Sequence, residues 1–324
     1  VASTCGGNLV ISHLFTYTDK YQQVKTLYLA TRFIGERCIM KKAVCVGINN
    51  YPGTSSDLQG CVNDANDWSA ALKGFGFETS LLLDSQATRK NVKAALSGLV
   101  TSAGEGDVIV FTYSGHGTQT LDLSNDEGDS YDEAVYVYDG TILDDDLRAI
   151  INKINPKATL IVISDSCFSG SVTRLVAQKA KPRFLPIENI SANRVVRKRF
   201  LLPETRMPEI LISGCTDSEY SYDAEINGRY NGAMSAMALS VIKQNSNITY
   251  NEFYAGLRSL LPSSDYPQTP QLEGSDVNKE TLLFQPFEAA PGPGPDPTPE
   301  PIPVPNDSPG CLPGVVKAVA RLFK

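Results

Sequence analysis

The regular alternation of short apolar runs with helix-like segments most constrains how this chain folds. From Lys42 onward, strands are expected at residues 43–48, 79–83, 108–113, 158–164 and 209–213, with helices at 60–73, 88–101, 144–153 and 232–243. Strands that alternate with helices predict an α/β fold, in which a mostly parallel sheet carries helices on both faces. In such sheets, functional side chains gather at the carboxyl ends of the strands.

Two segments interrupt this alternation and suggest how the chain is divided. Residues 174–206 contain nine basic residues and are predicted to be a linker loop. Residues 291–309 carry nine of the chain's 20 prolines, which is typical of a polyproline-II spacer. The prediction is an extension or prodomain at 1–39, a domain at 40–288 with halves 40–173 and 207–288, a Pro-rich linker at 289–310 and a tail at 311–324.

The tail contains a short segment with helical spacing of basic and apolar residues. Basic side chains alternate with an apolar stripe, namely Lys317, Arg321 and Lys324 opposite Val315, Val319 and Leu322. This pattern predicts either a basic amphipathic helix that docks on a partner or a solvated terminus. The Pro-rich tail is therefore a candidate for binding a protein.

Composition excludes several classes of protein. The net charge of −7 is spread over interspersed acids and bases, which argues against nucleic-acid or anionic-membrane binding. Seven cysteines without a CxxC pair, and only two histidines, argue against a disulfide scaffold and a zinc site. Without an apolar run of transmembrane length or a signal-peptide pattern, we expect a cytoplasmic protein with reduced thiols.

Two expected strands end in chemically reactive residues. "VIVFTYSGHG" ends with His116 between two glycines, and "TLIVISDSCFSG" ends with Cys167 and a glycine-containing turn. Because both follow apolar runs, both side chains are expected at the same edge of the sheet. His116 alone could be a turn histidine with a structural hydrogen bond, but the cysteine at the equivalent position favours a functional pair.

Cys167 differs from an ordinary core cysteine. Cys45, inside "AVCVGI", fits the usual role of a small buried side chain. Cys167 instead follows its strand and precedes small residues, where main-chain amides could stabilise an oxyanion. A thiol and an imidazole brought together by neighbouring strands suit acyl transfer to cysteine.

At these residues the sequence resembles the metacaspases, caspase-like cysteine peptidases found outside animals. The resemblance rests on "YSGHG" and "DSCFSG", and extends to "GINNYPG", "LQGCVNDANDW" and "ISGCTDSEYSYDA", so that it covers roughly Lys42 to Phe284. Two residues, Phe168 and Ser169, separate the cysteine from the glycine, which favours metacaspases over animal caspases. The resemblance implies a caspase-like αβα sandwich, and a prokaryotic-type member is expected.

The resemblance also implies the catalytic roles and the specificity. Cys167 would be the nucleophile and His116 the general acid, with the backbone amides of Gly117 and Cys167 forming the oxyanion hole. Cleavage after arginine or lysine is implied by an acidic pocket whose matching residues are Cys61, Asp64, Ser114 and Asp165. Two carboxylates and a hydroxyl suit a guanidinium. Asp64 could instead cap a helix, and Asp165 could simply stiffen the turn.

A calcium site is a further implication of the resemblance. The matching acids are Asp132, Asp144 and Asp145, and carboxylates suit this hard cation. A fourth acid of the family falls near Arg174, a departure that weakens the match, and Phe168 stands where the family often has histidine. The alternative is a solvated acidic loop whose aspartates cap a helix. No cofactor is expected for the chemistry itself, and calcium would act as an activator.

The leading hypothesis is a cysteine endopeptidase that acts on protein or peptide substrates with arginine or lysine at the cleavage site. The basic loop at 174–206 would then be a candidate for autocleavage, or else an ordinary surface loop. A catalytically silent caspase-like scaffold, and another thiol acyl-transfer enzyme, are the alternatives.

Overall fold

The computed structural model describes residues 38–121, 131–167, 180–185, 207–216 and 219–287. It also describes two short paired strands, β1 (Ser3–Cys5) and β2 (Asn8–Val10). The chain divides into two units, Val1–Glu288 and Ala289–Lys324. The predicted Pro-rich linker and tail, and most of the loop at 174–206, lie outside the described residues.

A six-stranded sheet forms the centre of the first unit. Its order is β14 (Gln271–Glu273), β11 (Glu209–Ser213), β9 (Thr159–Asp165), β5 (Val108–Ser114), β3 (Lys41–Gly47) and β4 (Glu78–Leu83). All neighbouring strands are parallel except β14, which runs antiparallel to β11. The mostly parallel sheet that the sequence predicts is confirmed.

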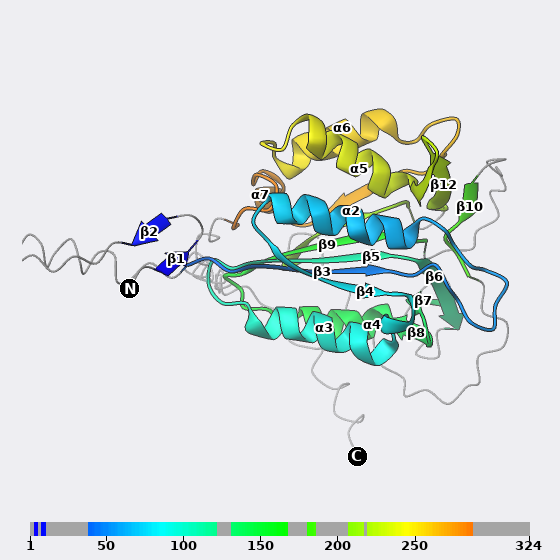
Figure 1. Cartoon of the computed structure of the whole chain (residues 1–324), viewed down its shortest axis with the longest axis horizontal. Coiled ribbons are helices and arrows are strands. Elements are labelled where there is room, and N and C mark those ends of the chain that lie inside the picture. Colours follow the sequence, from blue (N-terminus) through cyan, green and yellow to red (C-terminus); the bar gives the residue numbers. More distant parts are fainter. Residues whose placement is uncertain are drawn as a thin grey trace, which may run out of the picture. The chain divides into compact units, whose positions relative to one another are not determined.

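Helices cover both faces of this sheet (Figure 1). One layer contains α2 (Cys61–Gly74), α5 (Ala233–Gln244) and α6 (Tyr250–Leu260), and the other contains α3 (Arg89–Ser102) and α4 (Asp144–Ile151). Alternate residues of the strands point to opposite faces, so Ala43 and Cys45 join one core, whereas Val44 and Val46 join the other. Short helical turns complete the layers at η1 (Asp84–Gln86) and α7 (Asp276–Lys279).

Two small antiparallel sheets lie at the end of the main sheet where the functional residues gather. One contains β6 (His116–Leu121), β7 (Tyr131–Val137) and β8 (Gly140–Leu143). The other contains β10 (Ala180–Pro182), β12 (Tyr222–Ile226) and β13 (Arg229–Gly232). Figure 1 shows β6, β10 and β12 at the same end of the molecule.

The predicted helices and strands of the main layers agree with the structure to within a few residues, but β14, the two small sheets, α6 and α7 were not predicted. The strands of the small sheets are short and rich in polar residues, so they lack the long apolar runs that mark a buried strand. Cys38 is disulfide-bonded, so the expectation that all thiols are reduced is wrong at this residue.

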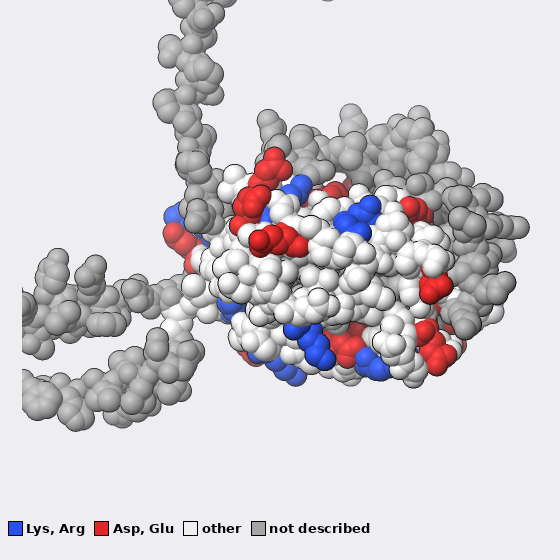
Figure 2. All heavy atoms as spheres, turned by 90° about the horizontal axis from the view of Figure 1, so that it is seen from above, with Lys and Arg blue, Asp and Glu red and all other residues white. Residues whose placement is uncertain are grey.

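The described surface agrees with the charge distribution inferred from composition. On the face seen in Figure 2, over α5 and α6, acidic and basic side chains are interspersed around a largely uncharged centre. Among the described residues, no helix combines the length and apolarity needed to cross a membrane.

Candidate active site

His116 and Cys167 follow the ends of the paired strands β5 and β9, and the backbone next to His116 meets the Cys167 backbone, as their positions after neighbouring strands predict. The two strands are paired so that Ser114 lies opposite Asp165, and each candidate follows two residues later. Gly117 contacts the Cys167 backbone so closely that an added Cβ would lie 1.7 Å from the Cys167 carbonyl oxygen. Only glycine fits here, which explains why the histidine is followed by one.

The His116 ring is held in one orientation by two neighbours. Its Nε2 lies 2.6 Å from the Ser56 carbonyl oxygen. Because a carbonyl only accepts, Nε2 carries the proton and Nδ1 of the neutral ring is left with a lone pair. Tyr51 packs against the ring with centroids 4.6 Å apart, and its hydroxyl accepts a hydrogen bond from the His116 amide.

The free Nδ1 is buried and has no hydrogen-bond partner of normal geometry among the described residues. Burial is the largest effect and lowers the pKa of His116 to about 4. The backbone groups of Ser56 and Arg183 act against this shift, whereas the charges of Lys181 and Arg183 act in the same direction as burial. The ring is therefore neutral near pH 7 and able to accept a proton.

The Cys167 thiol contacts the loop that precedes β12. The Ser221 amide donates a hydrogen bond to the sulfur at 2.6 Å, and the thiol lies 3.3 Å from the Ser221 carbonyl oxygen. Cys215 lies beside it, and a hydrogen bond with Cys167, together with burial, raises the pKa of the Cys215 thiol. Main-chain groups thus fix the position of the candidate nucleophile.

Segment 180–185, part of the basic loop, occupies this site as an extended strand. Its first three residues form β10, which pairs antiparallel with β12. The Arg183 amide then donates to the Ser221 carbonyl oxygen at 2.9 Å. The Arg183 carbonyl oxygen accepts hydrogen bonds from the amides of Gly117, at 3.0 Å, and Cys167, at 3.3 Å. These are the two amides expected to form an oxyanion hole, and they converge on one peptide carbonyl.

The Arg183 side chain enters a fully buried pocket of three carboxylates. One guanidinium nitrogen, Nη2, lies 2.7 Å from Asp64 Oδ2 and 3.0 Å from Asp223 Oδ1. The other, Nη1, lies 3.1 Å from the Asp165 carbonyl oxygen and 3.3 Å from Asp165 Oδ2. The arginine and all three acids are at most 3% exposed. These oxygen acceptors contact both terminal nitrogens of the guanidinium, which a single ammonium group could not match.

Backbone amides and small side chains hold the three pocket acids in place. Asp64 accepts hydrogen bonds from Asn231 Nδ2, at 2.9 Å, and from the Gly232 amide. Asp165 accepts one from the Ser235 amide and a short one from the Ser221 hydroxyl. Asp223 accepts hydrogen bonds from the amides of Gln59 and Gly60.

Gly232 is needed for close approach in this pocket. A Cβ at Gly232 would lie 2.1 Å from Asp165 Oδ2 and 2.4 Å from Arg183 Nη1, so a side chain here would block the pocket. Burial raises the pKa of Asp64, the Arg183 charge lowers it and the Asp165 carboxylate raises it, with a net increase. Burial therefore makes the Asp64 carboxylate costly to ionise, and the Arg183 charge offsets part of that cost.

Comparison with known proteins identifies the family. Residues 41–176 match the family model described as metacaspase, peptidase C14 domain. Metacaspase-1A of Aspergillus terreus is 34% identical over 76% of this chain and 74% of its own length. Metacaspase-1 of Schizosaccharomyces pombe is 31% identical over 75% of this chain and 70% of its own. The chain belongs to the metacaspases, which are cysteine-type peptidases.

Solved structures support the fold of this metacaspase. Protein GSU0716 from Geobacter sulfurreducens matches with a TM-score of 0.63 and 28% identity over 76% of this chain and all of that one. Caspase-1 from Spodoptera frugiperda matches with a TM-score of 0.50 and 11% identity over 73% of this chain and 88% of that one. The caspase-like sandwich is confirmed, whereas similarity to both fungal and bacterial proteins leaves the prokaryotic type a prediction.

The other two pocket residues predicted for the metacaspase lie at the same end of the sheet. Cys61 is fully buried at the start of α2, close enough to interact electrostatically with Arg183. Ser114 ends β5 and is 2% exposed. Sequence reasoning missed Asp223, the third acid, and Ser56, which orients the histidine through its backbone carbonyl.

The structure leaves the predicted calcium site untested. Asp144 and Asp145 lie in the first turn of α4, a position where carboxylates also stabilise the helix dipole. Asp132 belongs to β7, but its side chain is outside the described part. Among the side chains that are described, no group of three or more histidine, cysteine or acidic residues is placed to hold a metal ion.

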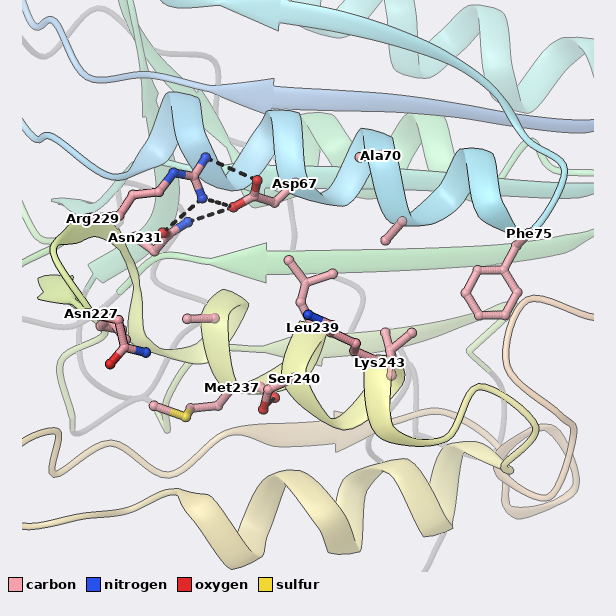
Figure 3. Close-up of a pocket in the computed structure, with 14 residues that line it drawn as sticks. Asp67, Ala70, Phe75, Asn227, Arg229, Asn231, Met237, Leu239, Ser240 and Lys243 are labelled. Carbon is pink, nitrogen blue, oxygen red and sulfur yellow. Dashed lines mark hydrogen bonds and ion pairs between the residues drawn. The ribbon is translucent and has the colours of Figure 1, made fainter.

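A second hollow lies between α2 and α5, with a volume of about 860 Å³ (Figure 3). Its walls are mostly apolar, and Arg229 pairs with Asp67 at one end. Asn231 connects this hollow to the acidic pocket, because its Nδ2 donates to both Asp67 and Asp64. The rest of its lining comes from α2, α5, the residue that follows α2 and the end of β12 with its turn.

Proposed function

We propose that this metacaspase hydrolyses peptide bonds after arginine or lysine, and that its own Arg183–Phe184 bond is a cleavage site. The supporting observation is the position of Arg183: its side chain is paired with three buried acids while its carbonyl oxygen faces the amides of Gly117 and Cys167. Arg183 thus places its side chain in the pocket proposed to give specificity and its carbonyl group at the amides proposed to support the chemistry.

In the first half of the proposed reaction, the Cys167 sulfur attacks the carbonyl carbon of the arginine while His116 Nδ1 takes the thiol proton. The negative charge on the carbonyl oxygen is stabilised by the two amides that already contact it. The carbon–nitrogen bond then breaks, and His116 transfers the proton to the leaving amine of Phe184. The product is a thioester between Cys167 and Arg183.

In the second half, a water molecule attacks the thioester carbonyl. His116 Nδ1 accepts a proton from this water, and the resulting tetrahedral intermediate uses the same two amides. The carbon–sulfur bond breaks, the sulfur regains a proton, and a carboxylate is left on Arg183. The orientation of His116 by Ser56 keeps Nδ1 available for both proton transfers.

Calcium activation, a cytoplasmic location and the prokaryotic type remain predictions. Calcium is included in the experiment below because the resemblance implies an acidic site near Asp144. The silent-scaffold alternative is tested by the same experiment.

The decisive experiment compares the wild type with Cys167→Ala and Arg183→Ala by intact-mass spectrometry, with and without added calcium. The wild type should yield a fragment that begins at Phe184, and Cys167→Ala should remain intact because it has no nucleophile. Arg183→Ala should lose this fragment, whereas Arg183→Lys should yield it more slowly, because one ammonium group cannot match the donor fork of a guanidinium.

Arg194→Ala is the matched control, since it removes another basic residue of the same loop outside the docked segment. It should still be cut after Arg183. If both the wild type and Cys167→Ala remained uncut, and an arginyl fluorogenic peptide were not turned over, the silent scaffold would be favoured. A fragment that persists in Arg183→Ala would exclude this bond as the site.

A further inference from the structure

We infer that this metacaspase also recognises the two residues after the cleaved bond. It selects an aromatic side chain at the first of these positions and an apolar aliphatic side chain at the second. The inference rests on the proposed function, because it takes segment 180–185 as the template of a bound substrate. It concerns Phe184 and Leu185, which the mechanism uses only as a leaving group.

The main chain of the segment is held on both sides of the Arg183–Phe184 bond. Before the bond, β10 pairs antiparallel with β12. After it, the segment pairs in parallel with β6, where Phe184 lies opposite Gly117 and the Leu185 amide donates to the Gly117 carbonyl oxygen at 3.0 Å. A substrate is therefore held by strand addition to two different sheets, with the cleavable bond where they meet.

The first residue after the cut contacts an aromatic side chain. The ring of Phe184 lies 6.1 Å from that of Tyr220, between centroids, with the planes tilted by 49°. Phe184 is half-buried, so the contact removes part of an apolar ring from water. Aromatic pairs in this geometry add to the affinity gained from burial alone.

The second residue after the cut is buried more deeply. Leu185 is 7% exposed, and its carbonyl oxygen accepts a hydrogen bond from the Thr118 hydroxyl at 2.6 Å. Thr118 itself is fully buried, so its hydroxyl is shielded from water and its loss would leave a carbonyl group unpaired. A peptide that ends at the cleaved arginine cannot make this contact.

Two peptides measure this recognition separately from the arginine pocket. One is Lys-Pro-Arg with a coumarin amide, which ends at the cut. The other is an internally quenched peptide that copies Ala-Lys-Pro-Arg-Phe-Leu-Pro and extends past it. The readout is the ratio of kcat/KM for the long peptide to that for the short one, in an Arg183→Ala background where the chain's own arginine does not compete.

Thr118→Val should lower this ratio about tenfold, because it leaves the carbonyl of the second residue without its donor. Tyr220→Ala should lower it about threefold, and it should abolish the preference for Phe over Ala in the long peptide. Thr112→Val removes another buried threonine hydroxyl, within β5, and should leave the ratio at its starting value.

Each outcome decides between the two proposals. If the short peptide is cut but the ratio is unaffected by Thr118→Val, by Tyr220→Ala and by replacing Phe and Leu in the long peptide, recognition beyond the cut is overturned and the proposed function stands. If neither peptide is cut, the proposed function fails, and this inference fails with it.

Discussion

Two regions of the molecule hold the same segment by opposite physical means. On one side, the amides of Gly117 and Cys167 contact the Arg183 carbonyl through neutral main-chain hydrogen bonds. On the other, the acidic pocket holds the Arg183 side chain through three buried carboxylates. The first contacts are available to any peptide, whereas the second require a positively charged side chain.

Under the proposed function, this difference would separate chemistry from specificity within one site. Amide donors recognise a carbonyl regardless of sequence, so they determine where a bond is cut along a strand but not which residue precedes it. Buried carboxylates are unfavourable without a cation, so under the proposed function we expect the pocket to discriminate strongly against neutral side chains. A change on one side should therefore alter different kinetic constants from a change on the other.

The largest effect that can test this division between the two regions is expected at Asp165. Asp165→Asn removes one of the carboxylates and leaves the arginine with less compensating charge, which should lower kcat/KM for an arginyl peptide by about 10²- to 10³-fold. The measurement uses the Arg183→Ala background and the short coumarin peptide. Asp67→Asn, which alters a partly exposed ion pair outside the pocket, is the control and should change kcat/KM less than threefold.

If Asp165→Asn left the preference for arginine intact, the division into chemistry and specificity would be wrong. The expected result is instead a loss of discrimination between arginyl and neutral peptides. Any cleavage that remains in Asp165→Asn should depend on Cys167 as cleavage by the unsubstituted pocket does.

A smaller effect is expected at Ser221, where the two regions meet. Its amide and carbonyl contact Cys167 and the Arg183 main chain, whereas its hydroxyl donates to Asp165. Ser221→Ala removes only the hydroxyl, so kcat/KM for the arginyl peptide should fall about tenfold. Ser69→Ala, which removes a buried hydroxyl paired with Thr79, is the matched control.

Separate values of kcat and KM make the Ser221 prediction more specific. Most of the loss at Ser221 should fall in KM, because the main-chain contacts that position the reacting carbonyl remain. A loss confined to kcat would instead show that the pocket and the oxyanion hole are not separable.

The remaining effect concerns stability and pH on the main-chain side of the site. Burial lowers the pKa of His116 from 6.5 to about 4 in the folded chain, so the unfolded chain binds the proton more readily between these values. The contribution of this residue to stability is therefore complete above about pH 6.5 and is lost as the pH falls toward 4. Asp64 acts in the opposite direction, because its raised pKa favours the folded state as the pH falls.

A difference measurement isolates the histidine from the aspartate. The free energy of unfolding of Cys167→Ala, which keeps the chain uncut, is compared with that of Cys167→Ala/His116→Asn across this pH range. The stability of the first should fall relative to the second as the pH decreases. Parallel curves would mean that His116 is already accessible to water in the uncut chain.

The main features of the fold and the reactive pair could be predicted because their signals are local. Apolar runs that end in "SGHG" and "SDSC" place His116 and Cys167 at one edge of a parallel sheet. Asp64 and Asp165 came from the resemblance. The fold and the reactive pair could be predicted because the neighbouring residues in the sequence indicate where each strand ends.

The missed features depend on long-range contacts or on groups that every residue carries. Asp223 lies on a short strand that meets Arg183 only through folding, and a lone acid in such a strand is usually solvated. Ser56 acts through its carbonyl oxygen, which leaves no signal in the sequence. Arg183 was one of nine basic residues in its loop, although the flanking Pro182 and Pro186 favour an extended strand and could have singled it out.

The docked segment is joined to the site by the chain itself. Only 16 positions separate Cys167 from Arg183, so the arginine faces the pocket at an effective concentration in about the millimolar range. Cleavage after Arg183 would not remove this tether, because Arg183 stays on the same fragment as Cys167. What would change is charge: the amides of Gly117 and Cys167, which contact a neutral carbonyl oxygen in the uncut strand, would then face a terminal carboxylate.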